Sequence, residues 1–172
     1  YLGDSWQEDY YIWDCAAGTG NLLAGLTNKY NIYASTLDQA DINVIHERIE
    51  HGANLLKNNV FQFDFLNDEF LPISKGGKLS DSLYAIISNE EKRKKLVVYI
   101  NPPYAEHGNS QSRSGKTAKS GVAKESNIYN HFSKIVGTGA RELFTQFFLR
   151  VYIDLPNVTL TSFSKLKHIN SQ

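Results

Sequence analysis

Residues 10–21 read YYIWDCAAGTGN. The apolar and aromatic residues 10–13 are typical of a buried strand, and Asp14 stands at its end. Gly18 and Gly20 follow, and glycines at such positions let the backbone turn tightly and approach a ligand at the start of a helix. The stretch therefore predicts a strand, a glycine turn and a helix in direct succession.

Strand and helix patterns alternate along the rest of the chain. Short apolar runs predict five strands, at about 10–14, 32–37, 60–65, 96–100 and 158–163. Helical spacing predicts helices from Gly20 to about 28, from a cap at Asp41 to about 56, over 82–95 and over 141–155. This alternation predicts an α/β fold with a doubly wound, mainly parallel sheet.

Two of the expected strands should be central and one should lie at an edge. The runs 10–13 and 96–100 are nearly continuous apolar sequence, as in strands buried on both faces. In contrast, Phe61, Phe63 and Phe65 alternate with polar residues. We therefore expect 60–65 at an edge of the sheet.

The composition narrows the class of protein. With 172 residues, 41% of them apolar, the chain can form one globular domain. Eighteen basic residues balance eighteen acidic ones, which is unusual for an autonomous nucleic-acid binder because phosphate contacts need Lys and Arg. The single cysteine, Cys15, excludes an internal disulfide, and no run approaches the roughly 20 apolar residues of a membrane span. We expect a cytoplasmic protein without a membrane partner.

Three carboxylates, Asp14, Asp38 and Asp64, fall at or near the ends of expected strands. In open α/β sheets ligands bind beyond these carboxyl ends. Asp38 is placed to accept hydrogen bonds from ribose hydroxyls, and Asp64 to accept one from an adenine amino group. A dinucleotide fingerprint would need a third glycine where Leu23 stands. A glycine turn of this kind is also found as a purely structural feature.

A second motif, Asn101-Pro102-Pro103-Tyr104, follows the apolar run 96–100. The exocyclic amine of adenine is a poor nucleophile because its lone pair is delocalised into the ring. If the Asn101 side-chain oxygen and the Pro102 carbonyl each accept one amino hydrogen, the lone pair becomes available. The two prolines hold both acceptors still, and Tyr104 offers a ring for stacking. This chemistry requires no general base and no metal.

Both motifs resemble those of one enzyme family. The pattern Asp14-x-x-x-Gly18-x-Gly20 resembles the first motif of the S-adenosylmethionine-dependent methyltransferases, with Asp38 and Asp64 at the second and third. Residues 101–104 resemble the fourth motif of the DNA amino-methyltransferases that make N6-methyladenine. The order of the motifs, with too few residues between them for a target-recognition domain, is similar to the gamma arrangement of bacterial restriction–modification systems.

The resemblance implies a set of roles. The cofactor, S-adenosylmethionine, would be bound by Asp14, Ala16, Gly18, Gly20, Asn21, Asp38, Asp64 and Phe65. Catalysis would fall to Asn101, Pro102, Pro103 and Tyr104. The reaction implied is methyl transfer to N6 of an adenine flipped out of double-stranded DNA, in a bacterial or archaeal cytoplasm. Further partners would be recognition and nuclease parts, either fused to the chain or separate.

The same resemblance bears on domain organisation. Residues 1–172 would form an incomplete catalytic domain of the class I, Rossmann-like methyltransferase type, without its last strands and without a target-recognition domain. We expect weak DNA methylation, without sequence preference, from these residues alone. In two respects the sequence departs from the family: Cys15 stands where relatives commonly have Pro, and the upstream cofactor-packing segment is not evident in residues 1–9.

Two other functions stay open. Glutamine-N5 methyltransferases that act on translation release factors also use Asn-Pro-Pro-Tyr, to hold a planar amide. The chain could also be a non-catalytic, cofactor-binding interaction module. Methylation assays on DNA and on a release factor separate the two enzymatic functions.

Residues 105–126 are rich in Ser, Gly, Asn and Lys, which predicts a mobile loop. It is either a plain linker or a lid that contacts phosphates through its cationic residues, Arg113, Lys116, Lys119 and Lys124. Gly115-Lys116-Thr117 lacks the first glycine of a phosphate-binding loop. His46, Glu47 and His51 lack zinc-site spacing, and we expect no metal.

Overall fold

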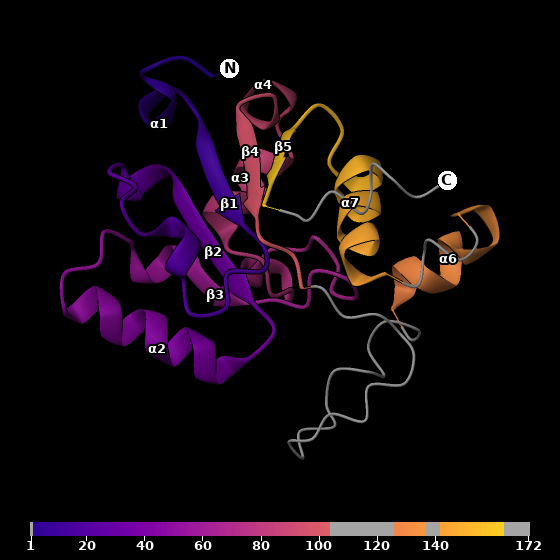
Figure 1. The fold of residues 1–172 in the computed structure, drawn as a ribbon, viewed down its shortest axis with the longest axis horizontal. Helices are drawn as coiled ribbons and strands as arrows, with labels where there is room; N and C mark the ends of the chain where they lie inside the picture. Colours follow the sequence, from indigo (N-terminus) through magenta and orange to yellow (C-terminus); the bar gives the residue numbers. More distant parts are fainter. Residues whose placement is uncertain (1, 104–125, 137–141, 164–172) are drawn as a thin grey trace.

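The centre of the molecule is a five-stranded, all-parallel sheet. The computed structural model describes residues 2–103, 126–136 and 142–163. The strands are β1 (Tyr11–Asp14), β2 (Ile32–Thr36), β3 (Val60–Gln62), β4 (Leu96–Ile100) and β5 (Thr159–Ser162). Their order is β3-β2-β1-β4-β5 (Figure 1). This is a Rossmann-like α/β fold, so the predicted fold class is confirmed.

Helices and short turns connect the strands. The α-helices are α1 (Trp6–Asp9), α2 (Gln39–Glu50), α3 (Asp81–Ile87), α4 (Glu90–Arg93), α6 (Asn127–Val136) and α7 (Leu143–Asp154). The 3-10 turns are η1 (Asn21–Leu23), η2 (Lys29–Asn31), η3 (Lys57–Asn59) and η4 (Ile73–Lys75). Within the described part of the chain, no helix is both long enough and apolar enough to cross a membrane.

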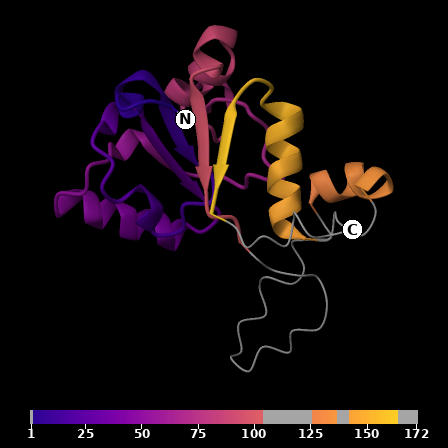
Figure 2. The same ribbon diagram turned by 45° about the horizontal axis from the view of Figure 1, so that its top comes forward.

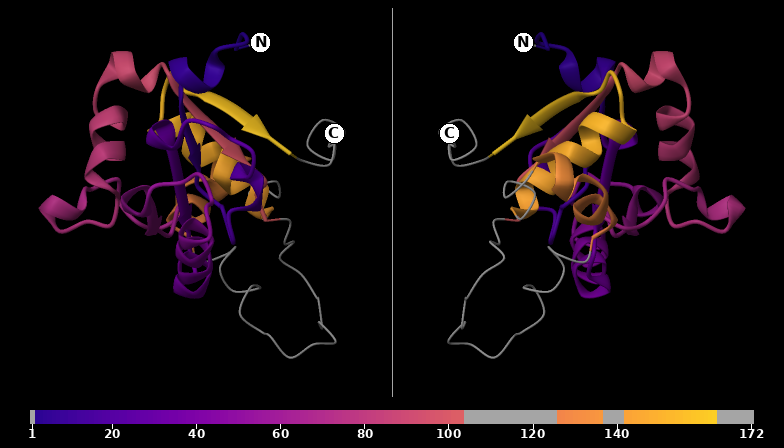
Figure 3. Two further views of the ribbon diagram at one scale, coloured as in Figure 1. Left: turned by 90° about the vertical axis from the view of Figure 1, so that its left-hand side faces the viewer. Right: turned by 90° about the vertical axis from the view of Figure 1, so that its right-hand side faces the viewer.

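Helices pack on both faces of the sheet. One face packs against α3 and α7 in a large cluster with many aromatic side chains, centred on Trp13 of β1. The other face packs against α2 in a smaller, mainly aliphatic cluster that includes Ile12 and Ile45. Figure 2 shows α7 beside β4 and β5, and Figure 3 shows α3 and α4 standing on one side of the molecule. The doubly wound arrangement follows from these two apolar faces.

The strand positions agree with the expectations. β1 and β4 are internal and pair with one another, and β3 lies at an edge. Phe61, Phe63 and Phe65 are all buried, as the alternation predicts. The expected strand over 60–65 is nevertheless too long, because β3 ends at Gln62 and the chain turns at Asp64, whose carboxylate accepts a hydrogen bond from the Leu66 N–H.

Two helix predictions after the glycine turn need correction. The helix expected from Gly20 to about 28 is only the single turn η1, because Gly25 has a left-handed φ of 89° that ends helical geometry. The next helix is capped by Asp38 rather than Asp41, since the Asp38 side chain accepts from the Ala40 N–H. That helix ends at Glu50, well before residue 56.

The helix expected over 82–95 is two helices. α3 ends at Ile87, and the Asn89 side chain then caps α4 by accepting a hydrogen bond from the Lys92 N–H. An asparagine that accepts from the backbone in this way favours a new helix start over a continued helix. The helix expected over 141–155 is α7, which is confirmed with slightly shorter bounds.

Candidate functional site at the carboxyl edge of the sheet

Both sequence motifs lie at the point where the strand order reverses. β1 pairs with β2 on one side and with β4 on the other. In the β1–β4 register Trp13 faces Val98, so Asp14 at the end of β1 lies level with Tyr99, and Asn101 follows two residues later, directly after β4. Neighbouring strands are about 4.8 Å apart. The glycine turn and the Asn-Pro-Pro motif are therefore neighbours at the topological switch point, where such folds bind ligands.

Backbone hydrogen bonds fix the glycine turn. The Ala17 N–H donates to the Ser35 carbonyl of β2 at 3.0 Å, and the Gly20 N–H donates to the Ala17 carbonyl at 2.8 Å. Gly18 and Gly20 both have left-handed φ angles, of 52° and 79°. A Cβ atom on Gly18 would meet nothing within 4 Å, whereas one on Gly20 would lie 3.3 Å from Ile45. Gly18 therefore borders open space, and Gly20 is packed against α2.

The three carboxylates share one local geometry. In each, Oδ1 accepts a hydrogen bond from the backbone N–H two residues further on: Ala16 at 3.1 Å for Asp14, Ala40 at 2.9 Å for Asp38, and Leu66 at 3.1 Å for Asp64. This is the Asx turn, which lets the chain leave a strand sharply. One oxygen of each carboxylate is thus used locally. The second oxygen has no described hydrogen-bond partner in Asp14 and Asp38, whereas in Asp64 it accepts from Asn67.

Asp14 is a buried carboxylate. Its side chain is 1% exposed at the end of β1. Burial raises the pKa of Asp14 to about 7, against a smaller lowering by the hydrogen bond from Ala16. Burial also raises the pKa of the adjacent Cys15 thiol well above its usual value, and the neighbouring Asp14 adds to this. A cationic ligand beside Asp14 would favour the ionised carboxylate.

The other cofactor residues of the prediction differ in exposure. Asp38 and Asn21 are exposed, and Ala16 and Asp64 are half-buried. Phe65 is different, because its side chain is 2% exposed and packs against Trp13 and Phe147. Its ring belongs to the core, so any contact of Phe65 with a ligand is restricted to its backbone.

The Asn-Pro-Pro motif leaves β4 without a regular turn. Asn101 and Pro103 are exposed and Pro102 is buried. Pro103 stands two residues after Asn101 and has no N–H, so Asn101 cannot form the Asx turn of the three aspartates. No described residue hydrogen-bonds to the Asn101 side chain. Tyr104 and the expected mobile loop, apart from Ser126, lie outside the described residues.

No family model, no curated protein and no solved structure matches this chain. The function is therefore inferred from the strand ends alone.

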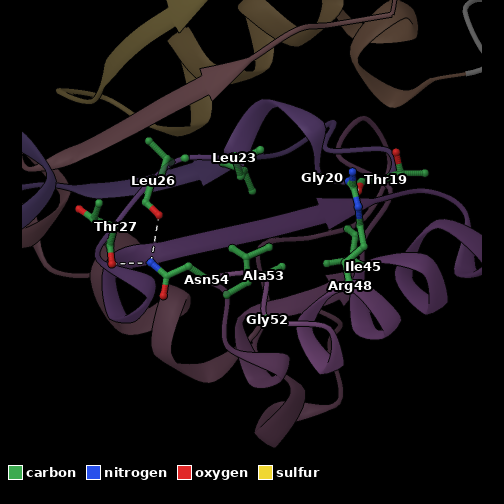
Figure 4. A pocket seen from close by; sticks show the side chains of 13 residues that line it. Thr19, Gly20, Leu23, Leu26, Thr27, Ile45, Arg48, Gly52, Ala53 and Asn54 are labelled. Atoms are coloured by element: carbon green, nitrogen blue, oxygen red, sulfur yellow. Dashed lines mark hydrogen bonds between the residues drawn. The ribbon is translucent and has the colours of Figure 1, made fainter.

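Two cavities are found among the described residues, and neither is lined by Asn101, Pro102 or Pro103. The larger, of about 490 Å³, lies between residues 19–27, α2 and residues 52–55, and Gly20 is the only expected cofactor residue that lines it (Figure 4). The smaller, of about 330 Å³, lies between residues 67–69, α6 and α7. Among the described residues, no group of three or more His, Cys, Asp or Glu side chains is arranged to hold a metal.

Two polar residues near Asp64, Asn67 and Arg150, were not predicted from the sequence. Asn67 donates from Nδ2 to Asp64 Oδ2 at 2.8 Å. Arg150 of α7 donates from Nη2 to the Asp68 carbonyl at 2.8 Å, lies 4.6 Å from the Phe70 ring centroid, and pairs with Asp154 at 2.6 Å. Asp-x-x-Asn directly after a strand was a local signal for the first contact, whereas nothing in the sequence pairs Arg150 with a residue 82 positions away.

Proposed function

We propose that this chain is the catalytic core of an S-adenosylmethionine-dependent DNA adenine N6-methyltransferase. The observation that carries the proposal is the pairing of β1 with β4. It brings an acidic strand end with a glycine turn next to an Asn-Pro-Pro strand end, at the edge where such sheets bind ligands. A purely structural origin would not require the two motifs to end adjacent strands.

The hydrogen-bond acceptors at the ends of β1 to β3 fit the cofactor. S-adenosylmethionine would supply the methyl group, and it carries a positive sulfonium, an amino group and ribose hydroxyls. Buried Asp14 offers a negative charge beside the turn, and Gly18 leaves room in front of it. Asp38 keeps one carboxylate oxygen without a described partner, because only its Oδ1 serves the helix cap. These features supply acceptors and space where the cofactor needs them.

The β4 side fits the substrate amine. The Asn101 side chain has no described partner, and the buried Pro102 holds the backbone beside it. Asn101 Oδ1 and the Pro102 carbonyl would each accept one hydrogen of the adenine amino group, which frees the nitrogen lone pair. Tyr104 would stack on the flipped base. The rival substrate, a glutamine amide, presents the same two hydrogens to the same acceptors.

Two measurements test the proposal. Calorimetry should show that residues 1–172 bind S-adenosylmethionine or its demethylated product, because every inferred cofactor contact lies within 14–65. Methylation assays with the full-length enzyme should then label adenine in DNA rather than a release factor. Absence of cofactor binding would contradict the proposal, and so would transfer to a glutamine side chain as the only reaction.

A further inference from the structure

The turn after β3 is tied to the start of α6 by one side chain, Asn67. Its Nδ2 donates to Asp64 Oδ2 at 2.8 Å, and its Oδ1 accepts the backbone N–H of Asn127 at 2.9 Å. The Asn127 side chain adds a third bond, from Nδ2 to the Asn67 carbonyl at 3.3 Å. Asn67 therefore joins segments that are 60 residues apart in the chain.

This chain of hydrogen bonds has a fixed polarity. The Asn127 N–H can only donate and the ionised Asp64 carboxylate can only accept, so the Asn67 amide must present its oxygen to one and its nitrogen to the other. Turning the amide over would break both bonds together. A change in the hydrogen bond to Asp64 therefore alters the hydrogen bond to Asn127, and the reverse also holds.

Both segments are fastened to α7 as well. Arg150 donates to the Asp68 carbonyl on the Asp64 side. On the α6 side, Ser126 and Gln146 are both fully buried, and Ser126 Oγ donates to Gln146 Oε1 at 2.6 Å while accepting from the Tyr129 N–H. With α7 as a common support, Asn67 spans two parts that are already held close. Little motion can occur between them without breaking its bonds.

We infer that Asn67 is a positioning residue that couples the Asp64 carboxylate to the N-terminus of α6. That Asp64 contacts the cofactor is part of the proposed function, so the link between Asn67 and the cofactor rests on that proposal. The coupling therefore joins the adenine-recognising end of the proposed cofactor site to the start of α6, and a ligand at Asp64 and the hydrogen bonds at the start of α6 should affect each other equally.

The test exploits the polarity of the bonds in the ligand-free protein. Asp64→Asn places two NH₂ groups against each other, and Asn67→Asp places two carboxylates there. Each single change should speed hydrogen exchange of the Asn127 amide about fivefold, the scale of one lost hydrogen bond, because repulsion from residue 64 moves the side chain of residue 67 away from the Asn127 N–H. The double variant, Asp64→Asn with Asn67→Asp, again sets a donor against an acceptor, and the second oxygen of the new carboxylate can accept the Asn127 N–H. Its exchange should return to within about twofold of wild type.

The matched control is Asn130→Ala, an exposed asparagine of the same helix, which should leave the Asn127 amide unchanged. Unaltered exchange in Asp64→Asn, or a double variant no better than its two parents, would overturn the coupling. Added S-adenosylmethionine should slow the same amide in the wild type. If the ligand-free result holds and calorimetry shows no binding of S-adenosylmethionine, the proposed function fails and the positioning role of Asn67 stands. If the cofactor binds without slowing this amide, the link from Asn67 to the cofactor site is refuted.

Discussion

The two sides of the switch point end their strands in opposite ways. After β1, β2 and β3, an aspartate folds its side chain back onto the N–H two residues on. After β4, Asn101 is followed by two prolines, so no N–H exists at that distance. The first arrangement uses a side-chain oxygen to build the turn, and the second leaves the Asn101 amide oxygen without a partner among the described residues. On the proposed function, the prolines would keep this acceptor available for the substrate in addition to holding it rigid.

On the proposed function, the largest effect should come from Asn101→Ala in the full-length protein. The substitution removes an acceptor that acts mainly as the lone pair develops, so turnover should fall at least about a hundredfold. Affinity for S-adenosylmethionine should stay at the wild-type value, because the cofactor contacts lie on the other side of the switch point. Steady-state kinetics and calorimetry measure the two quantities. Loss of cofactor affinity would show that the two sides are not separate.

Asp38→Ser removes one carboxylate oxygen and keeps a side chain that can cap α2. Affinity for the cofactor should weaken by roughly 1 to 3 kcal/mol, the range for hydrogen bonds to a charged acceptor. Thermal unfolding should change little. Asn89→Ser makes a comparable exchange at the cap of α4 and should leave the affinity as it is. Equal affinities in both variants would remove Asp38 from the site.

Cofactor binding should depend on pH through Asp14. The pKa of this carboxyl is about 7 in the folded chain and near 3.8 without burial. Between these values the folded state holds more protons, so the contribution of Asp14 to stability falls as pH rises through this window. The ionised form attracts a cation, so affinity should rise about tenfold from pH 6 to pH 8.

Asp14→Asn provides the comparison for this pH dependence. The variant keeps an oxygen for the Ala16 N–H and should bind S-adenosylmethionine with little change between pH 6 and pH 8. Asp41→Asn, a change in the first turn of α2, should retain the wild-type slope. If the affinity of Asp14→Asn still rose between pH 6 and pH 8, a group other than Asp14 would be responsible for the pH dependence.

Pro103→Ala directly tests the difference between the aspartate turns and the Asn-Pro-Pro strand end. Of the substitutions considered, it should have the smallest effect. It restores an N–H two residues after Asn101, which can then capture the Asn101 oxygen in an Asx turn like those of the aspartates. Turnover should fall about fivefold, the scale of one competing hydrogen bond, with cofactor affinity unchanged. Pro156→Ala, at an exposed proline between α7 and β5, controls for the loss of a proline ring. Full activity in Pro103→Ala would refute this role of the prolines.

Much of the fold could be predicted from local pattern. Continuous apolar runs identified the internal strands β1 and β4, and the alternation of Phe61, Phe63 and Phe65 placed β3 at an edge. The spacing of Leu22, Leu23 and Leu26 suggested a helix, but Gly25 and the hydrogen bonds that hold Thr27 to Gln7 and Asn54 favour a loop. Such contacts depend on distant residues and leave no periodic signal.

In the candidate site, too, features that depend on local sequence could be predicted, and features that depend on distant residues could not. Asp14, Gly18, Gly20 and Asn101 stand directly after strands, so their meeting at one edge of a parallel sheet could be predicted. Burial of the Phe65 ring follows from the alternation of the phenylalanines, but its stacking with Phe147 of α7 could not be predicted, because the two residues are far apart in the chain. Asn67 could be paired with Asp64 from its spacing, but its bond to Asn127 joins residues 60 positions apart and could not be predicted.

The reactivity of Cys15 can report on the opening of the end of β1. This residue is the chain's single cysteine, it is 2% exposed, and it adjoins Asp14 and the glycine turn. A thiol reagent reacts with the thiolate, and both burial and the raised pKa suppress that form. Labelling should therefore proceed only through transient opening of the end of β1. The rate of modification would then measure how often the carboxyl edge opens, without any mutation or attached dye, and a ligand seated on the glycine turn would slow it.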